Sequence, residues 1–322
     1  MADLMADHII DRTRMRRKLS FWRVVSVLAV IAAIGAIGWQ VGGSGAAPSD
    51  RHVARLSLSG LITGDRETLR LIESIAKSQA AAVVVNIESP GGTTTGAEKV
   101  YDELRRLSEK KPVVAVINNT GASGAYIAAL GADRIVAHGN SLVGSIGVLF
   151  QYPNVSRALD TLGVKMEEIK SSPLKASPNP FENTSPEARA ALASLVTDSY
   201  DWFRNLVRDR RKLSEEELKV VADGRVFTGR QALGVKLVDQ LGTERDAIAW
   251  LEAEKNIGRN LPVRDWRRPS TTGRWGIFSL SNVAEIAGFP MLGAVLRQAE
   301  AKADAGSLDG LLAVWHGRLS ID

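Results

Sequence analysis

The chain has 322 residues, of which 45% are hydrophobic and 24% charged, as in an ordinary globular protein. Its net charge of +5 comes from a basic cluster between Arg12 and Arg23, directly before an apolar stretch. No basic patch interleaved with aromatic residues is present, so we interpret the cluster as a membrane-topology signal and expect no nucleic-acid partner. The absence of cysteine excludes thiol catalysis, disulfides and cysteine metal sites.

Residues 24–41 form an uncharged apolar stretch of 18 residues. This length roughly spans a hydrocarbon core of about 30 Å, and Trp22 and Trp39 suit the two membrane interfaces. We therefore predict a cytoplasmic basic N-terminus at 1–23 and a transmembrane anchor at 24–41. The rest of the chain is then expected on the periplasmic or extracytoplasmic side of the inner membrane.

A cleaved signal peptide is the alternative, because Ser44–Ala46 has the small residues of a cleavage site. Cleaved apolar regions usually run about 7–15 residues, which favours an uncleaved anchor. Residues 42–50 are then a short flexible linker.

Between residues 51 and 257 the pattern predicts an alternation of strands and helices. The predicted strands are His52–Leu58, Ala82–Ile87, Pro112–Ile117, Arg134–Ala137, Ser145–Leu149, Val164–Ile169 and Arg225–Phe227. The predicted helices are Glu67–Lys77, Gly96–Glu109, Ser123–Leu130, Glu187–Lys212, Ser214–Ala222, Gly229–Gly234 and Arg245–Lys255. This order indicates an α/β domain whose parallel strands are buried on both faces.

Residues 258–322 are a C-terminal extension of uncertain structure. Within it, Phe278–Ala299 is fairly apolar with mixed spacing. This pattern fits a plain core or tail helix better than an amphipathic helix against a membrane or a neighbouring subunit.

Two turns after predicted buried strands carry the chemistry. The first is Ser89–Gly92, with the sequence Ser-Pro-Gly-Gly, and the second is Gly121–Tyr126, with Gly-Ala-Ser-Gly-Ala-Tyr. A Gly-Gly turn can present free backbone N–H groups, and Ser123 can present a hydroxyl beside them. The pair predicts an oxyanion hole that faces a nucleophile, although a serine at this point is commonly just a helix N-cap.

The base for such a serine is either histidine or lysine. The Ser123 segment nearly matches the nucleophile elbow of the α/β-hydrolases, which requires a later histidine. Only His138, 15 positions on, and His316, in the weakly patterned extension, follow it. An α/β-hydrolase esterase using His316 is therefore an open but poorly supported alternative.

A lysine can serve as the base only when its amine is neutral, which requires burial near apolar groups. The candidates are Lys165, Lys170 and Lys175. Lys175 lies in a proline-bounded loop with no acidic neighbour before Glu182, which suits a base better than Lys165 beside two glutamates. A solvated loop lysine remains the plain alternative.

At this point several ordered motifs resemble the signal peptide peptidase A family of membrane-anchored serine proteases. They are the two turns above, Gly144–Val148, the stretch Ile169–Lys175, Gly224–Ala232 and Leu237–Asp239. The resemblance runs from about His52 to Leu251. It implies a Clp/crotonase-like fold of repeated ββα units, a Ser–Lys dyad, and no cofactor or metal.

When the family's motif positions are matched to this sequence, the resemblance implies that Ser123 is the nucleophile and Lys175 the general base. Ser145 would orient the lysine amine, and the backbone N–H groups of Gly92 and Gly124 would be the oxyanion donors. The sequence departs from the family pattern at Ser172 and Ala125, where glycine is common. Neither departure removes a reacting group.

The resemblance also implies an endopeptidase that clears cleaved signal peptides or other apolar peptides. Chains of this length look like the single-copy form, which assembles as a homo-oligomeric ring and completes each dyad with the neighbouring subunit. Acyl-CoA chemistry on the same fold is discouraged by the predicted export. A non-catalytic membrane scaffold on this fold is the remaining alternative.

Overall fold

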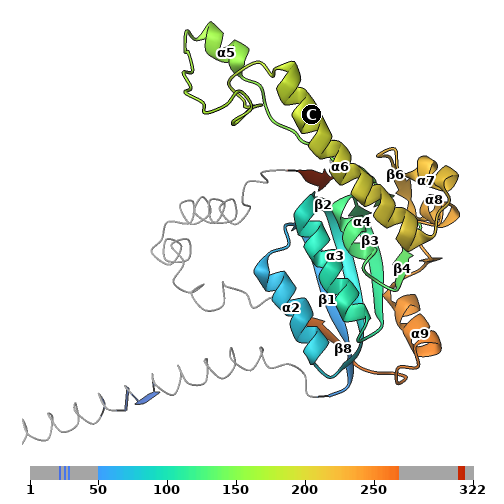
Figure 1. The fold of residues 1–322 in the computed structure, drawn as a ribbon. Helices are drawn as coiled ribbons and strands as arrows, with labels where there is room; N and C mark the ends of the chain where they lie inside the picture. Colours follow the sequence, from blue (N-terminus) through green and yellow to red (C-terminus); the bar gives the residue numbers. More distant parts are fainter. Residues whose placement is uncertain (1–21, 23–24, 27, 30–49, 268–310, 316–322) are drawn as a thin grey trace, which may run out of the picture.

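The computed structural model describes residues 22, 25–26, 28–29, 50–267 and 311–315 of the chain (Figure 1). The predicted anchor at 24–41 lies outside the described residues, apart from four of its positions. In the part of the chain that is described, no helix has the length and apolar character needed to cross a membrane. The predicted helix Phe278–Ala299 also lies outside the described residues.

The described residues form a mixed, largely parallel β-sheet. Its strands are β1 (His52–Ile62), β2 (Ala80–Thr93), β3 (Val113–Ala122), β4 (Arg134–Ala137), β5 (Leu142–Gly144), β6 (Val226–Thr228), β7 (Gln240–Leu241), β8 (Val263–Trp266) and β9 (Leu312–Val314). The main path runs β6-β5-β3-β2-β1-β8, and β4, β7 and β9 branch from it. Among the paired strands of the described residues, only β2–β9 and β5–β6 are antiparallel. The predicted α/β class is confirmed.

Helices cover this sheet and connect its strands. They are α2 (Arg66–Lys77), α3 (Thr94–Ser108), α4 (Gly124–Ala129), α5 (Ser156–Thr161), α6 (Pro186–Arg211), α7 (Glu215–Val221), α8 (Gly229–Gly234) and α9 (Glu244–Glu254). Local signals explain where several begin. Asp65 caps α2 by accepting from Thr68 N, and the predicted capping box of Ser214 and Glu217 opens α7.

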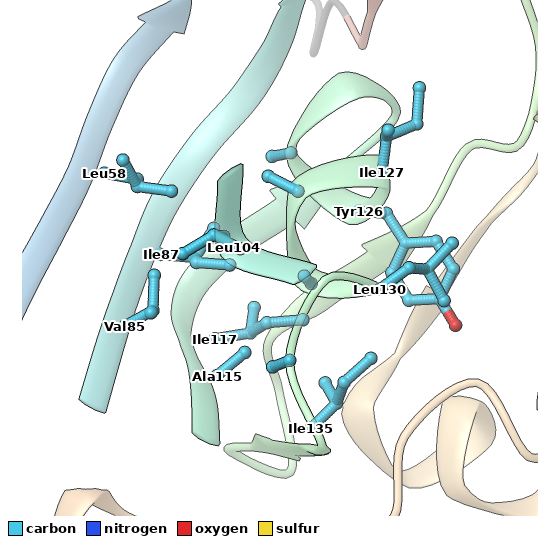
Figure 2. Close-up of a cluster of buried hydrophobic side chains, with 14 of the residues drawn as sticks. Leu58, Val85, Ile87, Leu104, Ala115, Ile117, Tyr126, Ile127, Leu130 and Ile135 are labelled. Carbon is cyan, nitrogen blue, oxygen red and sulfur yellow. The ribbon is translucent and has the colours of Figure 1, made fainter. Parts of the chain in front are cut away.

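The strands are buried on both faces because their apolar residues run continuously. In β2, Val83, Val85 and Ile87 face the larger core with α2, α3 and α4, and part of this cluster is drawn in Figure 2. Ala82 and Val84 face the smaller core, which α9 covers with Ala247 and Leu251. Each fully buried valine or isoleucine stabilises the fold by about 1.5–3 kcal/mol. This packing holds the ends of β2 and β3 rigidly side by side.

One part of the chain projects from this body. We call residues 150–185 the arm; it contains α5 and leads into α6, whose far end carries it away from the sheet (Figure 1). Near its other end α6 is anchored, because Phe203 and Val207 are buried and Arg210 donates to Leu130 O and Ala132 O, both at 2.9 Å.

Two predicted strands differ from the structure. Instead of Ser145–Leu149, the strand is β5, which ends at Gly144, because positive φ values at Gly144 (99°) and Ser145 (50°) turn the chain. No strand forms at Val164–Ile169 either. That segment lies in the arm, where Ile169 is fully exposed and has no buried face to pack.

The sheet also extends past the predicted domain boundary at residue 257. β8 pairs in parallel with β1, and β9 pairs antiparallel with β2. Residues after 257 therefore contribute strands to the same sheet. Their short lengths carry too little periodicity to be recognised from sequence.

Candidate active site

The glycine turn at the end of β2 has a backbone that only glycine permits. Gly91 has φ 114°, and a Cβ at Gly92 would lie 1.9 Å from Ile62 O. The buried Ser89 hydroxyl accepts a hydrogen bond from Gly91 N at 3.1 Å. Ser89 and the adjacent strand therefore hold this turn in one conformation, with its backbone N–H groups at the end of the sheet.

Ser123 connects β3 to α4 in a strained conformation, with φ 54° and ψ −120°. Such a backbone costs about 1–3 kcal/mol for a residue with a side chain, and such strain clusters at functional sites. The hydroxyl makes no capping hydrogen bond to α4. Its backbone N–H continues the β3–β5 ladder by donating to Gly144 O at 2.7 Å. Ser123 therefore stands at the N-cap position of α4, but its side chain does not cap the helix.

The two turns meet next to this serine. A Cβ at Gly124 would lie 3.1 Å from Gly92 N, and a Cβ at Gly91 would lie 2.9 Å from Gly124 N. The backbone nitrogens of Gly92 and Gly124 thus border one small space that a methyl group would fill. Two backbone donors converging beside a serine can stabilise the oxyanion of acyl transfer.

Ser145 lies on the adjoining turn. It is buried with φ 50°, and its N–H donates to Arg225 O at 2.8 Å. Its neighbour Gly144 accepts the hydrogen bond from Ser123 N, so the chain brings Ser145 close to the nucleophile segment. Four of the five predicted site residues therefore gather at one end of the sheet: Ser123, Gly124, Gly92 and Ser145.

The fifth, Lys175, lies in the arm. Its side chain is exposed, whereas Ser123 is 1% exposed, and its own N–H donates to Ser172 O at 3.1 Å. A lysine in contact with so buried a serine would have a covered amine. One chain by itself therefore does not bring the predicted base to the nucleophile.

The other lysines of the arm fit the role less well. Lys170 donates to Glu168 and Glu182, at 2.6 and 2.9 Å. Both hydrogen bonds raise the pKa of Lys170, which keeps its amine protonated and unable to accept a proton. Lys165 is exposed beside Glu167 and Glu168.

The histidines offer no base among the described residues. His52 is buried, stacks on Trp266, accepts from its Nε1 at 3.1 Å and bonds Asp50 O at 2.7 Å. His138 is exposed, and His316 lies outside the described residues. Within the described ranges no cluster of three or more histidine and acidic side chains could hold a metal ion.

Two features of the site were missed from the sequence. Ser89 orients the glycine turn, and its position inside the Ser-Pro-Gly-Gly motif was the available signal. The second is β9, which lies on Gly91–Thr93. A strand of only three residues shows no hydrophobic periodicity, so nothing in the sequence indicated β9.

Known proteins match this chain over the same region. Residues 105–258 match the model of Peptidase family S49. The "Putative protease slr0021" of Synechocystis sp. is 40% identical over 202 residues, covering 62% of this chain and 73% of that protein. The "Putative protease MJ0651" of Methanocaldococcus jannaschii is 32% identical over 213 residues, covering 66% and 68%.

A third relative is the "Putative signal peptide peptidase SppA" of Enterococcus faecium, 31% identical over 224 residues and covering 65% of each chain. Among solved structures, a point mutant of ClpP1 from Listeria monocytogenes is similar at 15% identity and a TM-score of 0.40, covering 60% of this chain and 94% of that one. That similarity assigns no fold, and the Clp/crotonase-like fold stays an expectation from the family resemblance.

Proposed function

The chain belongs to Peptidase family S49 and is a serine peptidase of the Ser–Lys type, and we propose that Ser123 and Lys175 are its dyad. The observation that carries the assignment of Ser123 is its strained backbone and non-capping side chain, beside the nitrogens of Gly92 and Gly124. Membership in a peptidase family also disfavours the esterase that would use His316.

The proposed reaction is acyl transfer through an acyl-enzyme. The neutral Lys175 amine takes the Ser123 proton as Oγ attacks the substrate carbonyl, and the oxyanion is held by the N–H groups of Gly92 and Gly124. Lys175 then gives the proton to the leaving amine. Water hydrolyses the ester, with the same amine as base. Ser145 accepts a hydrogen bond from the amine and orients it.

The exposed position of Lys175 supports a dyad completed between subunits. The arm exposes an unusual set of apolar side chains, namely Leu162, Val164, Met166, Ile169, Leu174 and Phe181. Such a surface favours contact with another protein surface, and contact would bury the amine and favour its neutral form. We therefore place the arm of one subunit over the Ser123 site of the next, in a homo-oligomeric ring.

The proposed substrates are cleaved signal peptides and other apolar peptides. The name of the Enterococcus faecium relative supports this class, as does the apolar stretch at 24–41 that would tether the enzyme to the membrane. The basic residues before that stretch support a cytoplasmic N-terminus and a catalytic domain on the extracytoplasmic side.

Single variants of the full chain test the dyad. Ser123→Ala and Lys175→Ala should each lower the rate of apolar-peptide cleavage by about 10⁴-fold or more, with assembly unchanged by sedimentation. Lys165→Gln, which changes an exposed lysine of the same arm, should keep most of the activity. An active Lys175→Ala protein would refute the dyad, and failure of a fluorophosphonate probe to label wild-type Ser123 would favour a non-catalytic scaffold.

Mixing the two inactive variants tests the shared site. If each site takes Ser123 from one subunit and Lys175 from the next, random co-assembly should restore about a quarter of the wild-type activity, because one site in four then has both groups. If both groups come from one chain, the mixture stays inactive.

A further inference from the structure

The helix that carries the arm joins the core of the body only at one end. α6 has 26 residues, so at about 1.5 Å per residue it is about 39 Å long. All of these residues are described, and only Phe203 and Val207 among them belong to the buried core of the body. Both lie within residues 200–211, the last three turns, which we call the root. The direction in which α6 carries the arm is therefore set at the root (Figure 1).

Arg210 ties the root to the helix that follows Ser123. Its Nε and one terminal nitrogen donate to Leu130 O and Ala132 O, both at 2.9 Å. Leu130 is the C-cap of α4, which begins directly after Ser123. The last carbonyls of a helix have no partners inside the helix, and Arg210 supplies donors at this end. The root of α6 therefore lies against the far end of α4.

Arg211 ties the root to a second part of the body. It donates from Nε to Lys236 O at 2.7 Å and from its two terminal nitrogens to the Asp239 carboxylate, at 2.6 and 3.1 Å. The Arg211 side chain is only 12% exposed, and a bidentate pair of this kind fixes direction as well as distance. Asp239 is itself held, because it accepts from Ile135 N of β4 at 2.7 Å. Two successive arginines thus hold the root on two different elements.

The loop that Arg211 contacts also reaches α4. The Tyr126 hydroxyl, which is fully buried and labelled in Figure 2, donates to Leu237 O at 2.7 Å. Tyr126 comes three residues after Ser123. Leu237–Asp239 is one of the motifs of the sequence, and the proposed reaction gives it no role. Its position shows that it joins α4 to the root of α6.

A small tilt at the root becomes a large displacement at the arm. Over about 39 Å, a tilt of about 5° would move the far end of α6 by roughly 3 Å. A misplacement of about 1 Å can cost a reaction about 10²-fold in rate. The position of α4 is less sensitive, because all six of its residues are buried in the surrounding core. The arginines therefore matter most for what the arm carries.

From these contacts we propose that Arg210 and Arg211 are positioning residues of the peptidase. They fix the direction of α6, and so the place at which the arm presents Lys175 to Ser123 of the next subunit. The inference rests on the proposed dyad shared between subunits. Both arginines act through α6, from the end opposite to the arm, and neither takes part in the proton transfers.

Mixed assemblies test the inference, because they show which chain needs the arginine. Arg211→Met is placed in the Ser123→Ala chain, which can supply only Lys175, and this protein is mixed with Lys175→Ala. The restored peptide cleavage should be at least about 10-fold below that of the same mixture without the Arg211 change. In the Lys175→Ala chain, which can supply only Ser123, Arg211→Met should leave the activity nearly unchanged. Sedimentation should show the same assembly in every mixture.

Two further variants complete the test. Arg208→Met removes an arginine of the same turn whose ion pair with Glu215 is partly solvent-exposed, and it should lower the activity in neither chain. Arg211→Lys keeps the charge but loses the bidentate pair, so it should give a smaller loss than Arg211→Met, again only in the chain that supplies Lys175. Arg211→Lys takes the place of Arg211→Met if the latter does not assemble.

The mixture of Ser123→Ala and Lys175→Ala without an arginine change separates this inference from the proposed function. If that mixture is inactive while wild type cuts the peptide, the shared dyad is refuted. The inference then falls with it, because α6 presents no base to a neighbour. If the mixture is active but Arg211→Met lowers the activity equally in both chains, or in neither, the inference alone is refuted and the shared dyad stands.

Discussion

The sheet end around Ser123 and the arm at residues 150–185 differ in how completely a single chain fixes their conformation. At the sheet end, Ser123 and the glycine turns are buried and held by hydrogen bonds to the Gly144 carbonyl and the Ser89 hydroxyl. In the arm, even apolar side chains such as Ile169 are exposed. The contrast indicates that the proposed nucleophile and oxyanion donors are preorganised in each chain, whereas the proposed base, Lys175, needs contact with a second surface.

Outside the proposed dyad, the largest effect should come from filling the space between the proposed oxyanion donors. Gly124→Ala would place a methyl group 3.1 Å from Gly92 N, in the position of the developing oxyanion. We expect kcat to fall by about 10²–10³-fold. Tm should fall as well, because the same methyl group would lie 2.9 Å from Ala313 O and the backbone there must shift. Peptide-cleavage kinetics and thermal unfolding of the same preparation measure the two quantities.

Gly234→Ala is the matched control for this change. Nothing lies within 4 Å of a Cβ at Gly234, so its kcat should equal that of wild type. Normal activity of Gly124→Ala would show that the preorganised half of the site lies elsewhere.

A smaller effect should come from loosening the loop that carries Lys175. Glu182 cross-links this loop because it accepts hydrogen bonds from Lys170, Ser177 and Asn179, each at 2.9 Å. Glu182→Gln should lower kcat by about 10-fold, because a misplaced base is costly, while Tm stays nearly constant. Steady-state kinetics of this variant beside Glu167→Gln, an exposed glutamate of the same loop, make the test.

The pH dependence of this loop has a definite sign. Hydrogen bonds from Lys170 and Ser177 lower the pKa of Glu182. Its contacts are therefore complete above the ordinary pKa of a glutamate, about 4.3, and are lost as the pH falls through the lowered value. The protection factors of the arm amides, which are corrected for the intrinsic exchange rate at each pH, should fall only in that acidic range. A loss of protection near neutral pH would contradict the role of Glu182.

The smallest effect should come from an ion pair of the body. Arg55 bridges Glu244 of α9 and Asp265 of β8, and Glu244 also accepts from Asn86 at 2.8 Å. Burial opposes ionisation of Glu244, but the hydrogen bonds from Arg55 and Asn86 outweigh it and lower its pKa. Glu244→Gln should reduce the free energy of unfolding by about 1 kcal/mol at pH 7, since the pair is partly exposed.

The pH dependence distinguishes this ion pair from simple packing. A lowered folded-state pKa stabilises the protein above the unfolded pKa, and this stabilisation is lost as the pH falls through the folded value. Urea unfolding at pH 7 and below about pH 4 should therefore show a difference between Glu244→Gln and wild type that shrinks in acid. An unchanged kcat of Glu244→Gln at pH 7 would show that the loss of stability does not involve the active site.

Much of the core and of the nucleophile half was predictable from residues 51–257. Continuous apolar runs, helical spacing and capping residues predicted the strands β1 to β4 and the helices α2, α3, α6, α7, α8 and α9. The observed ends differ from the predicted ones by a few positions, and β1, β2 and β3 extend into the turns that follow them. These signals are local. The Gly-Gly turn and Ser123 were predictable for the same reason, since the glycines that allow these tight backbone turns are part of the motifs themselves.

By itself the sequence determined the α/β class and the family, and it was enough to propose Ser123 as the nucleophile and Gly92 and Gly124 as the oxyanion donors. Only the tertiary structure decided that Ser145 ends a turn instead of starting a strand, that Lys175 lies exposed in the arm, and that β9 covers Gly92. The first and the third depend on contacts between residues far apart in the chain: Ser145 with Arg225, and Gly92 with Ala313. Such contacts are chosen by the packing of the whole domain, which no short stretch of residues specifies.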